Sequence, residues 1–105
     1  MTSRAHTKEE MLEMMMQHLE SQPDYWNNVK EYTTLEKLEG MLFSILVMFD
    51  GGTMVLPALD IVPHPHPSDK KYHIDEDENY WDEVVINDTS LHDLYCARKK
   101  KRKDK

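Results

Sequence analysis

The segment from residue 35 to residue 49 constrains the fold more than any other part of the chain. Its apolar residues keep helical spacing over about four turns; they are Leu35, Leu38, Met41, Leu42, Ile45, Leu46 and Phe49. Residues 43, 47 and 48 are also apolar, so we expect this end of the helix to be buried on all sides. Thr33 and Glu36 match a capping box before it, and Gly51 and Gly52 supply a left-handed residue that ends it. This segment predicts the central helix of the core.

A further pair of helices is predicted before this one. Thr7 and Glu10 match a second capping box, and the apolar stripe of the helix that follows is Leu12, Met15, Met16 and Leu19. We expect that helix to end near residue 20. Ser21 and Pro23 suit an N-cap and a first helical turn, so a separate short helix is predicted over residues 23–32.

Beyond Gly52 the pattern changes from helical to extended. Apolar stretches at residues 54–56, 59–62 and 84–86 predict short strands, residues 68–83 predict a polar loop, and Ser90 suits the cap of a last helix. The fold class predicted is α+β, with N-terminal helices, a long central core helix, a small two-stranded β element and a C-terminal helix. We expect one domain over residues 7–97, between disordered ends at residues 1–6 and 98–105.

Charge is distributed unevenly along the chain. Residues 98–105 carry seven Lys or Arg and one Asp, a net charge of +6. Because the net charge of the whole chain is −7, residues 1–97 have a net charge of −13. So acidic a body repels nucleic acid and anionic membranes, which argues against specific nucleic-acid binding. Such charge also keeps a small protein soluble, and that simpler explanation stays open. The longest apolar run, residues 41–49, is shorter than the roughly 20 residues that span a bilayer.

The acidic, aromatic stretch at residues 75–83 is the favoured binding site. It combines charges that steer a partner with aromatic side chains that anchor one. The predicted partner-binding residues are Asp75, Glu76, Asp77, Glu78, Tyr80, Trp81, Asp82 and Glu83. They predict a protein-binding module, of the inhibitor or immunity-protein kind, that docks on a larger protein.

A histidine cluster supports a second hypothesis. Three imidazoles and a carboxylate within ten residues would suit zinc, and the candidate ligands are His64, His66, Asp69 and His73. Their spacing matches no established zinc motif, and a rigid, solvated proline-rich loop explains the same residues. The main expectation is therefore a protein without a cofactor, with a metal-binding protein or small metal-dependent enzyme as the alternative.

Two further features have structural and functional interpretations. A methionine face, formed by Met11, Met14, Met15 and Met16, would suit a homodimer contact or the chain's own core. Cys96 follows His92 by one helical turn, which allows a thiolate–imidazole pair, although a lone cysteine is more often a packing residue. No coherent catalytic set is present, so an enzyme is not the favoured hypothesis. The single cysteine and the absence of a secretory leader predict a cytoplasmic protein.

Several motifs in the last two thirds of the chain resemble a group of small bacterial and phage proteins of unknown function. The motifs are Phe43-Ser44-Ile45-Leu46, Asp50-Gly51-Gly52, Leu56-Pro57-Ala58-Leu59-Asp60-Ile61-Val62-Pro63, Asp69 through Tyr72, Glu78-Asn79-Tyr80 and Leu91-His92-Asp93-Leu94-Tyr95. The resemblance implies a bacterial or phage origin and brings no activity, cofactor or catalytic residue with it. The methionine-rich first helix and the basic tail are not features of that group.

Overall fold

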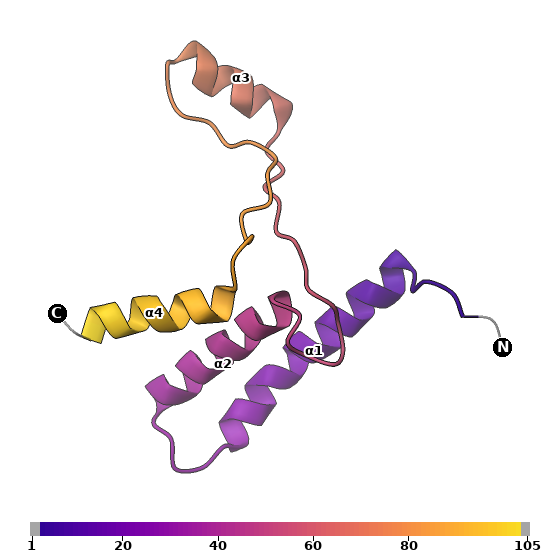
Figure 1. The fold of residues 1–105 in the computed structure, drawn as a ribbon, viewed down its shortest axis with the longest axis vertical. Coiled ribbons are helices and arrows are strands. Elements are labelled where there is room, and N and C mark those ends of the chain that lie inside the picture. Colours follow the sequence, from indigo (N-terminus) through magenta and orange to yellow (C-terminus); the bar gives the residue numbers. More distant parts are fainter. Residues whose placement is uncertain (1–2, 104–105) are drawn as a thin grey trace. The chain divides into compact units, whose positions relative to one another are not determined.

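The computed structural model describes residues 3–103, and the chain divides into two compact units. The first comprises Met1–Leu59 together with Leu91–Lys105, and we call its described part the helical unit. The second is the excursion Asp60–Ser90, which we call the arm. The helical unit contains α1 (Lys8–Asn28), α2 (Thr34–Phe49) and α4 (Leu91–Lys103), and the arm contains α3 (Pro67–Asp75) (Figure 1).

The predicted α+β fold is wrong, because residues 3–103 contain helices and no β-strand. Residues 54–56, 59–62 and 84–86, which were predicted as strands, are irregular. The basic residues 98–103, predicted as a disordered tail, form the C-terminal half of α4. Positions 1 and 2 of the predicted disordered N-terminus, and 104 and 105 of the predicted tail, lie outside the described residues.

The failure of the β prediction has a local cause in the backbone of the arm. Ile86 N–H donates to the Ile61 carbonyl at 2.9 Å, so the two segments do meet. Another hydrogen bond at this place comes from a side chain, because Asn87 Oδ1 accepts from Ile61 N–H at 2.6 Å. Pro63 and Pro65 have no N–H group, so a ladder cannot continue along their segment. The extended segments are therefore joined without forming a sheet.

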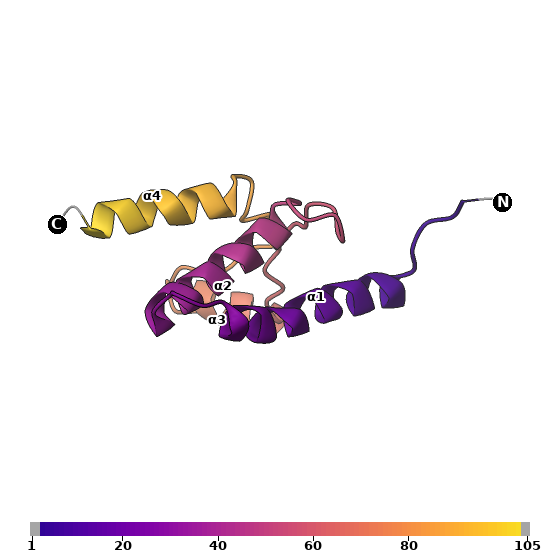
Figure 2. The same cartoon turned by 90° about the horizontal axis from the view of Figure 1, so that it is seen from below.

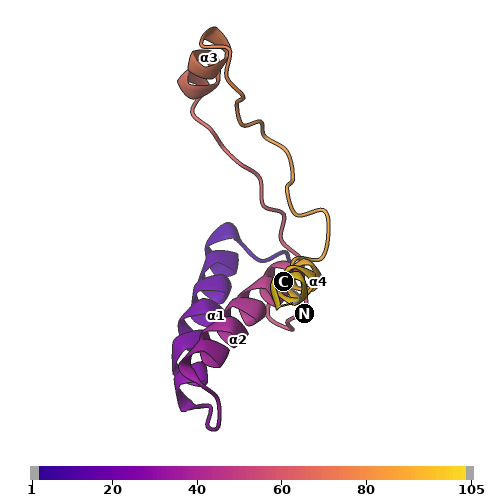
Figure 3. The same cartoon turned by 90° about the vertical axis from the view of Figure 1, so that its left-hand side faces the viewer.

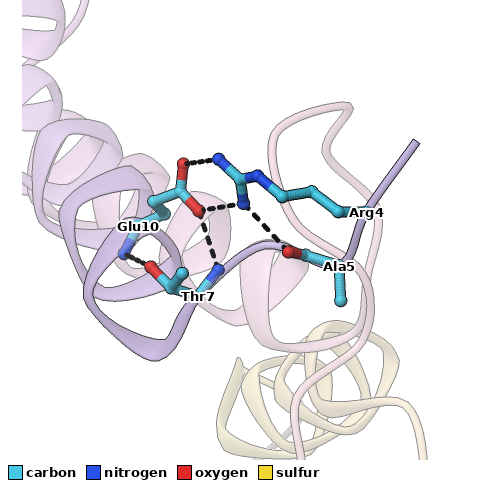
Figure 4. Close-up of polar contacts among 4 residues, drawn as sticks. All are labelled: Arg4, Ala5, Thr7 and Glu10. Atoms are coloured by element: carbon cyan, nitrogen blue, oxygen red, sulfur yellow. Dashed lines mark hydrogen bonds and ion pairs between the residues drawn. The ribbon is translucent and has the colours of Figure 1, made fainter. Parts of the chain in front are cut away.

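The first helix begins with the predicted capping box (Figure 4). Thr7 Oγ1 accepts from Glu10 N–H at 3.1 Å, and Glu10 Oε1 accepts from Thr7 N–H at 2.8 Å. Arg4 adds a bidentate contact to the Glu10 carboxylate, at 2.7 and 3.1 Å. The Arg4 guanidinium and then the Thr7 backbone lower the pKa of Glu10 to about 2. This carboxylate therefore stays ionised at the positive end of the helix over the physiological pH range.

The boundary predicted near residue 20 is wrong, because α1 continues through Pro23 to Asn28. Ser21 Oγ donates to the His18 carbonyl one turn earlier, at 2.7 Å, and so does not act as an N-cap. Proline inside a helix lacks one backbone donor, which favours a break without forbidding continuation. Tertiary contact of the last turns of α1 with α2 provides the compensation.

That contact depends on a glycine. A Cβ atom at Gly40 of α2 would lie 2.5 Å from the Trp26 ring of α1, so only glycine permits this approach. The indole is itself held in place, since Trp26 Nε1 donates to Gln22 Oε1 at 3.2 Å and Gln22 is buried. Helix α2 lies between α1 and α4 and contacts both (Figures 1 and 2).

The C-terminus of α2 is closed by two backbone bonds of a Schellman motif. Gly51 N–H donates to the Met48 carbonyl at 3.1 Å, and Gly52 N–H donates to the Val47 carbonyl at 2.9 Å. Gly51 has a φ of 80°, and a Cβ atom there would lie 2.6 Å from the backbone nitrogen of Ala58. Both the conformation and the lack of space therefore require glycine, as the sequence predicted.

The residue before that turn connects α2 to α4. Asp50 is the C-cap of α2, and its carboxylate accepts from the backbone N–H groups of Leu91 and His92, both at 2.8 Å. An ionised carboxylate only accepts hydrogen bonds, so His92 Nδ1–H donates to Asp50 Oδ2, at 2.5 Å. The side chain of Asp50 is 9% exposed. One carboxylate thus satisfies the start of α4 and fixes it against the end of α2.

The hydrophobic core is small. Among residues 3–103 the buried hydrophobic residues are Met48 and Leu56. The prediction that α2 is buried on all sides from residue 41 is wrong, because Leu42 is 44% exposed and Phe43 is 36% exposed. Much of the apolar stripe of α2 is consequently accessible, which makes the polar contacts of Asp50 a large share of what organises the helical unit.

We expect Asp50→Asn to lower the free energy of unfolding by about 1–3 kcal/mol, because an amide cannot supply charge-assisted acceptors to all three donors. Urea unfolding followed by far-UV circular dichroism measures this. Asp93→Asn, in the first turn of α4, is the matched control, since that side chain is 77% exposed and should contribute less than about 1 kcal/mol. Equal destabilisation by the two variants would contradict the role given to Asp50.

The same pair of proteins has an expected pH dependence. Burial acts to raise the pKa of Asp50, but the hydrogen bonds from His92 and Leu91 outweigh it and leave the pKa below its ordinary value. A lowered carboxyl pKa stabilises the fold above the ordinary value, about pH 4, and this contribution disappears as the pH falls below it. The stability difference between wild type and Asp50→Asn should therefore shrink below about pH 4.

Candidate interaction surface

The arm is organised around α3, which the sequence pattern placed in a polar loop. His66 is the N-cap, its Nδ1 accepting from Ser68 N–H at 3.2 Å, and Pro67 occupies the start of the helix. Asp69 lies in the first turn, where a negative charge is favourable. These residue types match the start of a helix, so the sequence does contain a signal for α3. The proline-rich stretch before it favoured an extended chain instead.

The end of α3 is closed by an aspartate in a left-handed conformation. Asp77 has a φ of 58°. Its N–H donates to the Ile74 carbonyl at 3.1 Å, and Glu78 N–H donates to the His73 carbonyl at 2.8 Å. This is the same Schellman motif as at the end of α2, with aspartate in place of glycine. The motif reverses the chain and sends residues 78–90 back along residues 60–66 (Figure 3).

Side chains of α3 hold the returning segment in position. Lys70 Nζ lies 5.0 Å from the centre of the Tyr80 ring and 3.6 Å from Asp82 Oδ1. The His73 ring meets the Trp81 ring edge to face, with 5.4 Å between centroids. Sequence reasoning found the two aromatic residues, missed Lys70 and considered His73 only as a metal ligand, because a cation–π contact across ten residues depends on where α3 ends. Tyr80 and Trp81 are thus presented in a braced conformation.

The arm exposes large apolar side chains and buries none of its residues 60–90. Eight such side chains are between 41% and 63% exposed: Val62, Tyr72, Ile74, Tyr80, Trp81, Val84, Val85 and Ile86. Trp81, the largest of them, is 63% exposed. Isolated exposed apolar residues are ordinary on a protein surface, but eight within 31 residues that include no buried residue are more than that.

The arm also carries the negative charge of the whole protein. Residues 60–90 contain nine acidic residues and two lysines, a net charge of −7, which equals the total for the chain. The remaining residues contain 11 acidic and 11 basic residues and are neutral overall. Of the net −13 of residues 1–97, −7 lies in the arm, and the remaining −6 is balanced by the +6 of residues 98–105. Acidic and apolar character coincide there.

All eight predicted partner-binding residues lie in this unit and are exposed. Asp75 ends α3, Glu76 is its C-cap and Asp77 forms the turn, while the other five lie on the returning segment. They belong to one consecutive stretch of the chain, residues 75–83, which we call the acidic–aromatic segment.

The candidate zinc ligands are not brought together. Nδ1 of His64 contacts Glu83 Oε1 at 3.1 Å, whereas Nδ1 of His66 caps α3. His73 packs between aromatic rings, and its Nδ1 lies 3.8 Å from Glu78, too far for a hydrogen bond. Asp69 lies in the first turn of α3. Within residues 3–103 no group of three or more metal-ligating side chains converges.

The remaining sequence candidates lie in the helical unit. His92 is engaged by Asp50, so its contact with the α2 cap accounts for its position, and Cys96 on the next turn of α4 is exposed. On the predicted methionine face of α1, Met11 is 43% and Met16 is 41% exposed, while Met14 and Met15 are half-buried. This face is partly available and partly used against the rest of the unit.

No family model matches this chain, and no curated protein or solved structure is similar enough to count as a match. The resemblance to small bacterial and phage proteins therefore stays a prediction. Within residues 3–103, no helix has the length and apolar character needed to cross a membrane.

We expect Asp77→Gly to stabilise the end of α3, because glycine adopts a positive φ without the steric cost that an L-residue bears. A gain of about 0.5–1 kcal/mol corresponds to a two- to fivefold slower hydrogen exchange of the Glu78 amide under native conditions. Glu76→Gly is the control, since Glu76 has a negative φ and gains no such relief. Faster exchange at Glu78 in Asp77→Gly would show that the turn depends on the aspartate side chain.

Proposed function

We propose that this chain is a protein-binding module that docks on a basic, partly apolar surface of another protein through the acidic–aromatic segment. The observation that carries the proposal is the composition of the arm: eight exposed large apolar side chains, a net charge of −7 and no buried residue. Burying such apolar surface is what a partner would gain, and the charge would accelerate the encounter.

The bracing of the aromatic residues supports the same proposal. Tyr80 and Trp81 rest against Lys70 and His73 of α3, so little conformational freedom is left to lose when a partner covers them. Aromatic side chains held in this way are typical binding hot spots. A non-catalytic action, such as blocking a basic site on an enzyme, fits a surface that offers contact area and charge. A cytoplasmic location, in keeping with a single cysteine, belongs to this proposal.

The test is affinity capture at low and high salt, with lysine-specific cross-linking of the retained complex. The arm has two lysines, Lys70 and Lys71, so cross-links from them report contact by the arm itself. We expect one polypeptide in near-equal amount, cross-linked to these lysines and released by high salt. Tyr80→Ala/Trp81→Ala should reduce its retention at least tenfold, through lost burial of two aromatic rings.

The matched control is Leu12→Ala/Met16→Ala on α1, which removes two other exposed apolar side chains, at 53% and 41%, without touching the arm. This variant should retain the partner at the wild-type level. Equal loss by both variants would indicate nonspecific apolar adhesion. Undiminished capture by the arm variant, or no polypeptide cross-linked to the arm, would refute the proposal.

A further inference from the structure

The helical unit carries a groove whose chemistry complements the arm. Helices α2 and α4 run side by side (Figure 2). The groove lies between them and has a volume of about 430 Å³. Leu35, Leu42 and Tyr95 give it an apolar lining, and Leu35 and Leu42 are 64% and 44% exposed. The groove therefore offers apolar surface that the helical unit itself does not cover.

The same groove is cationic along α4. Lys99, Arg102 and Lys103 line it, and their spacing of three and four residues puts them on one face of the helix. Lys99 forms an ion pair with Glu39 of α2. Lys103 also acts on Glu36 of α2, whose pKa it helps to lower. With three cations and Glu39 as the one acid among the described residues of its lining, the groove keeps an excess of positive charge. An apolar lining with excess positive charge is the counterpart of an acidic segment with aromatic side chains.

We propose that this groove receives the acidic–aromatic segment of a second copy of the chain. The arrangement is reciprocal, so that each copy inserts its segment into the groove of the other in a closed twofold dimer. Acidic side chains of the segment meet Arg102 and Lys103, while Tyr80 or Trp81 covers Leu35 and Leu42. This inference rests on the proposed function and names the partner of that same surface.

Complementary charge argues for a second copy as the occupant. Each chain carries one acidic–aromatic segment and one cationic groove, so two copies satisfy both surfaces of each other at once. The arm of the same chain is the other candidate occupant, and binding of that kind would leave the protein monomeric at every concentration.

Paired charge reversals test the dimer directly. The groove variant is Arg102→Glu/Lys103→Glu. The arm variant is Asp75→Lys/Glu76→Lys/Glu78→Lys/Glu83→Lys, which changes the net charge of residues 75–83 from −6 to +2. Cations at positions 75 and 76 also suit the C-terminus of α3. Each variant alone then opposes like charges, at groove and segment. Mixed in equal amounts, the two present opposite charges at both contacts. Sedimentation equilibrium at about 50 mM and about 500 mM salt gives the mass in each case.

We expect wild type to dimerise at low salt and to dissociate at high salt. Each variant alone should bind itself at least tenfold more weakly. The mixture of the two variants should form a heterodimer. Lys100→Glu/Lys101→Glu reverses the same charges outside the groove, and Asp60→Lys/Asp88→Lys does so at the base of the arm. Both controls should dimerise like wild type. Circular dichroism of every variant shows whether the helices are retained.

Three results would overturn the inference: a wild type that stays monomeric at about 100 µM in low salt, a dimer unaffected by either reversal, or a mixture that fails to associate. A monomeric wild type whose Lys70 and Lys71 still cross-link to a different protein would end the self-association proposal and leave the proposed function standing. A monomeric wild type with no such cross-links would end both.

Discussion

The carboxylate of Asp50 is the contact on which the arrangement of the helical unit depends. It ends α2 and begins α4, although Leu91 and His92 lie more than 40 residues further along the chain. It can do so because the backbone turns at Gly51, where φ is positive and a Cβ atom would meet the backbone of Ala58. With Met48 and Leu56 as the buried hydrophobic residues of the described part, a charge-assisted cap takes on a role that a larger core would otherwise have.

Closure at Asp50 also explains how the arm can exist. The chain leaves the helical unit after Leu59, whose N–H bonds to the Phe49 carbonyl, and returns at Leu91 on the Asp50 carboxylate. Both ends of the excursion are therefore fixed at one place, and the residues between them need not contribute to the core. Freed from that constraint, the arm can keep its large apolar side chains and its net negative charge on the surface.

The division of charge and apolar surface gives the molecule two complementary faces. The arm is acidic and aromatic, whereas the groove between α2 and α4 is cationic and aliphatic with one tyrosine. Lys70 and His73 hold Tyr80 and Trp81 in place, so the acidic–aromatic segment is prepared for contact before a partner arrives. Area, charge and rigidity of this kind are what association requires.

The sequence by itself determined the features that depend on neighbours in the chain. The capping boxes at Thr7 and Thr33 and the stop at Gly51 were predictable, because each is a local match between residue type and backbone conformation. The acidic–aromatic composition of residues 75–83 was equally plain. The tertiary structure decided the rest. Pro23 stays inside α1 since Trp26 packs on Gly40. The predicted strands remain irregular since the side chain of Asn87, and not a backbone carbonyl, accepts the hydrogen bond from Ile61 N–H. Local patterns also do not encode contacts between residues distant in sequence, such as that of Asp50 with α4 and those that form the groove beside Arg102. The contact of His73 with Trp81 depends on where α3 ends, which the sequence pattern did not give.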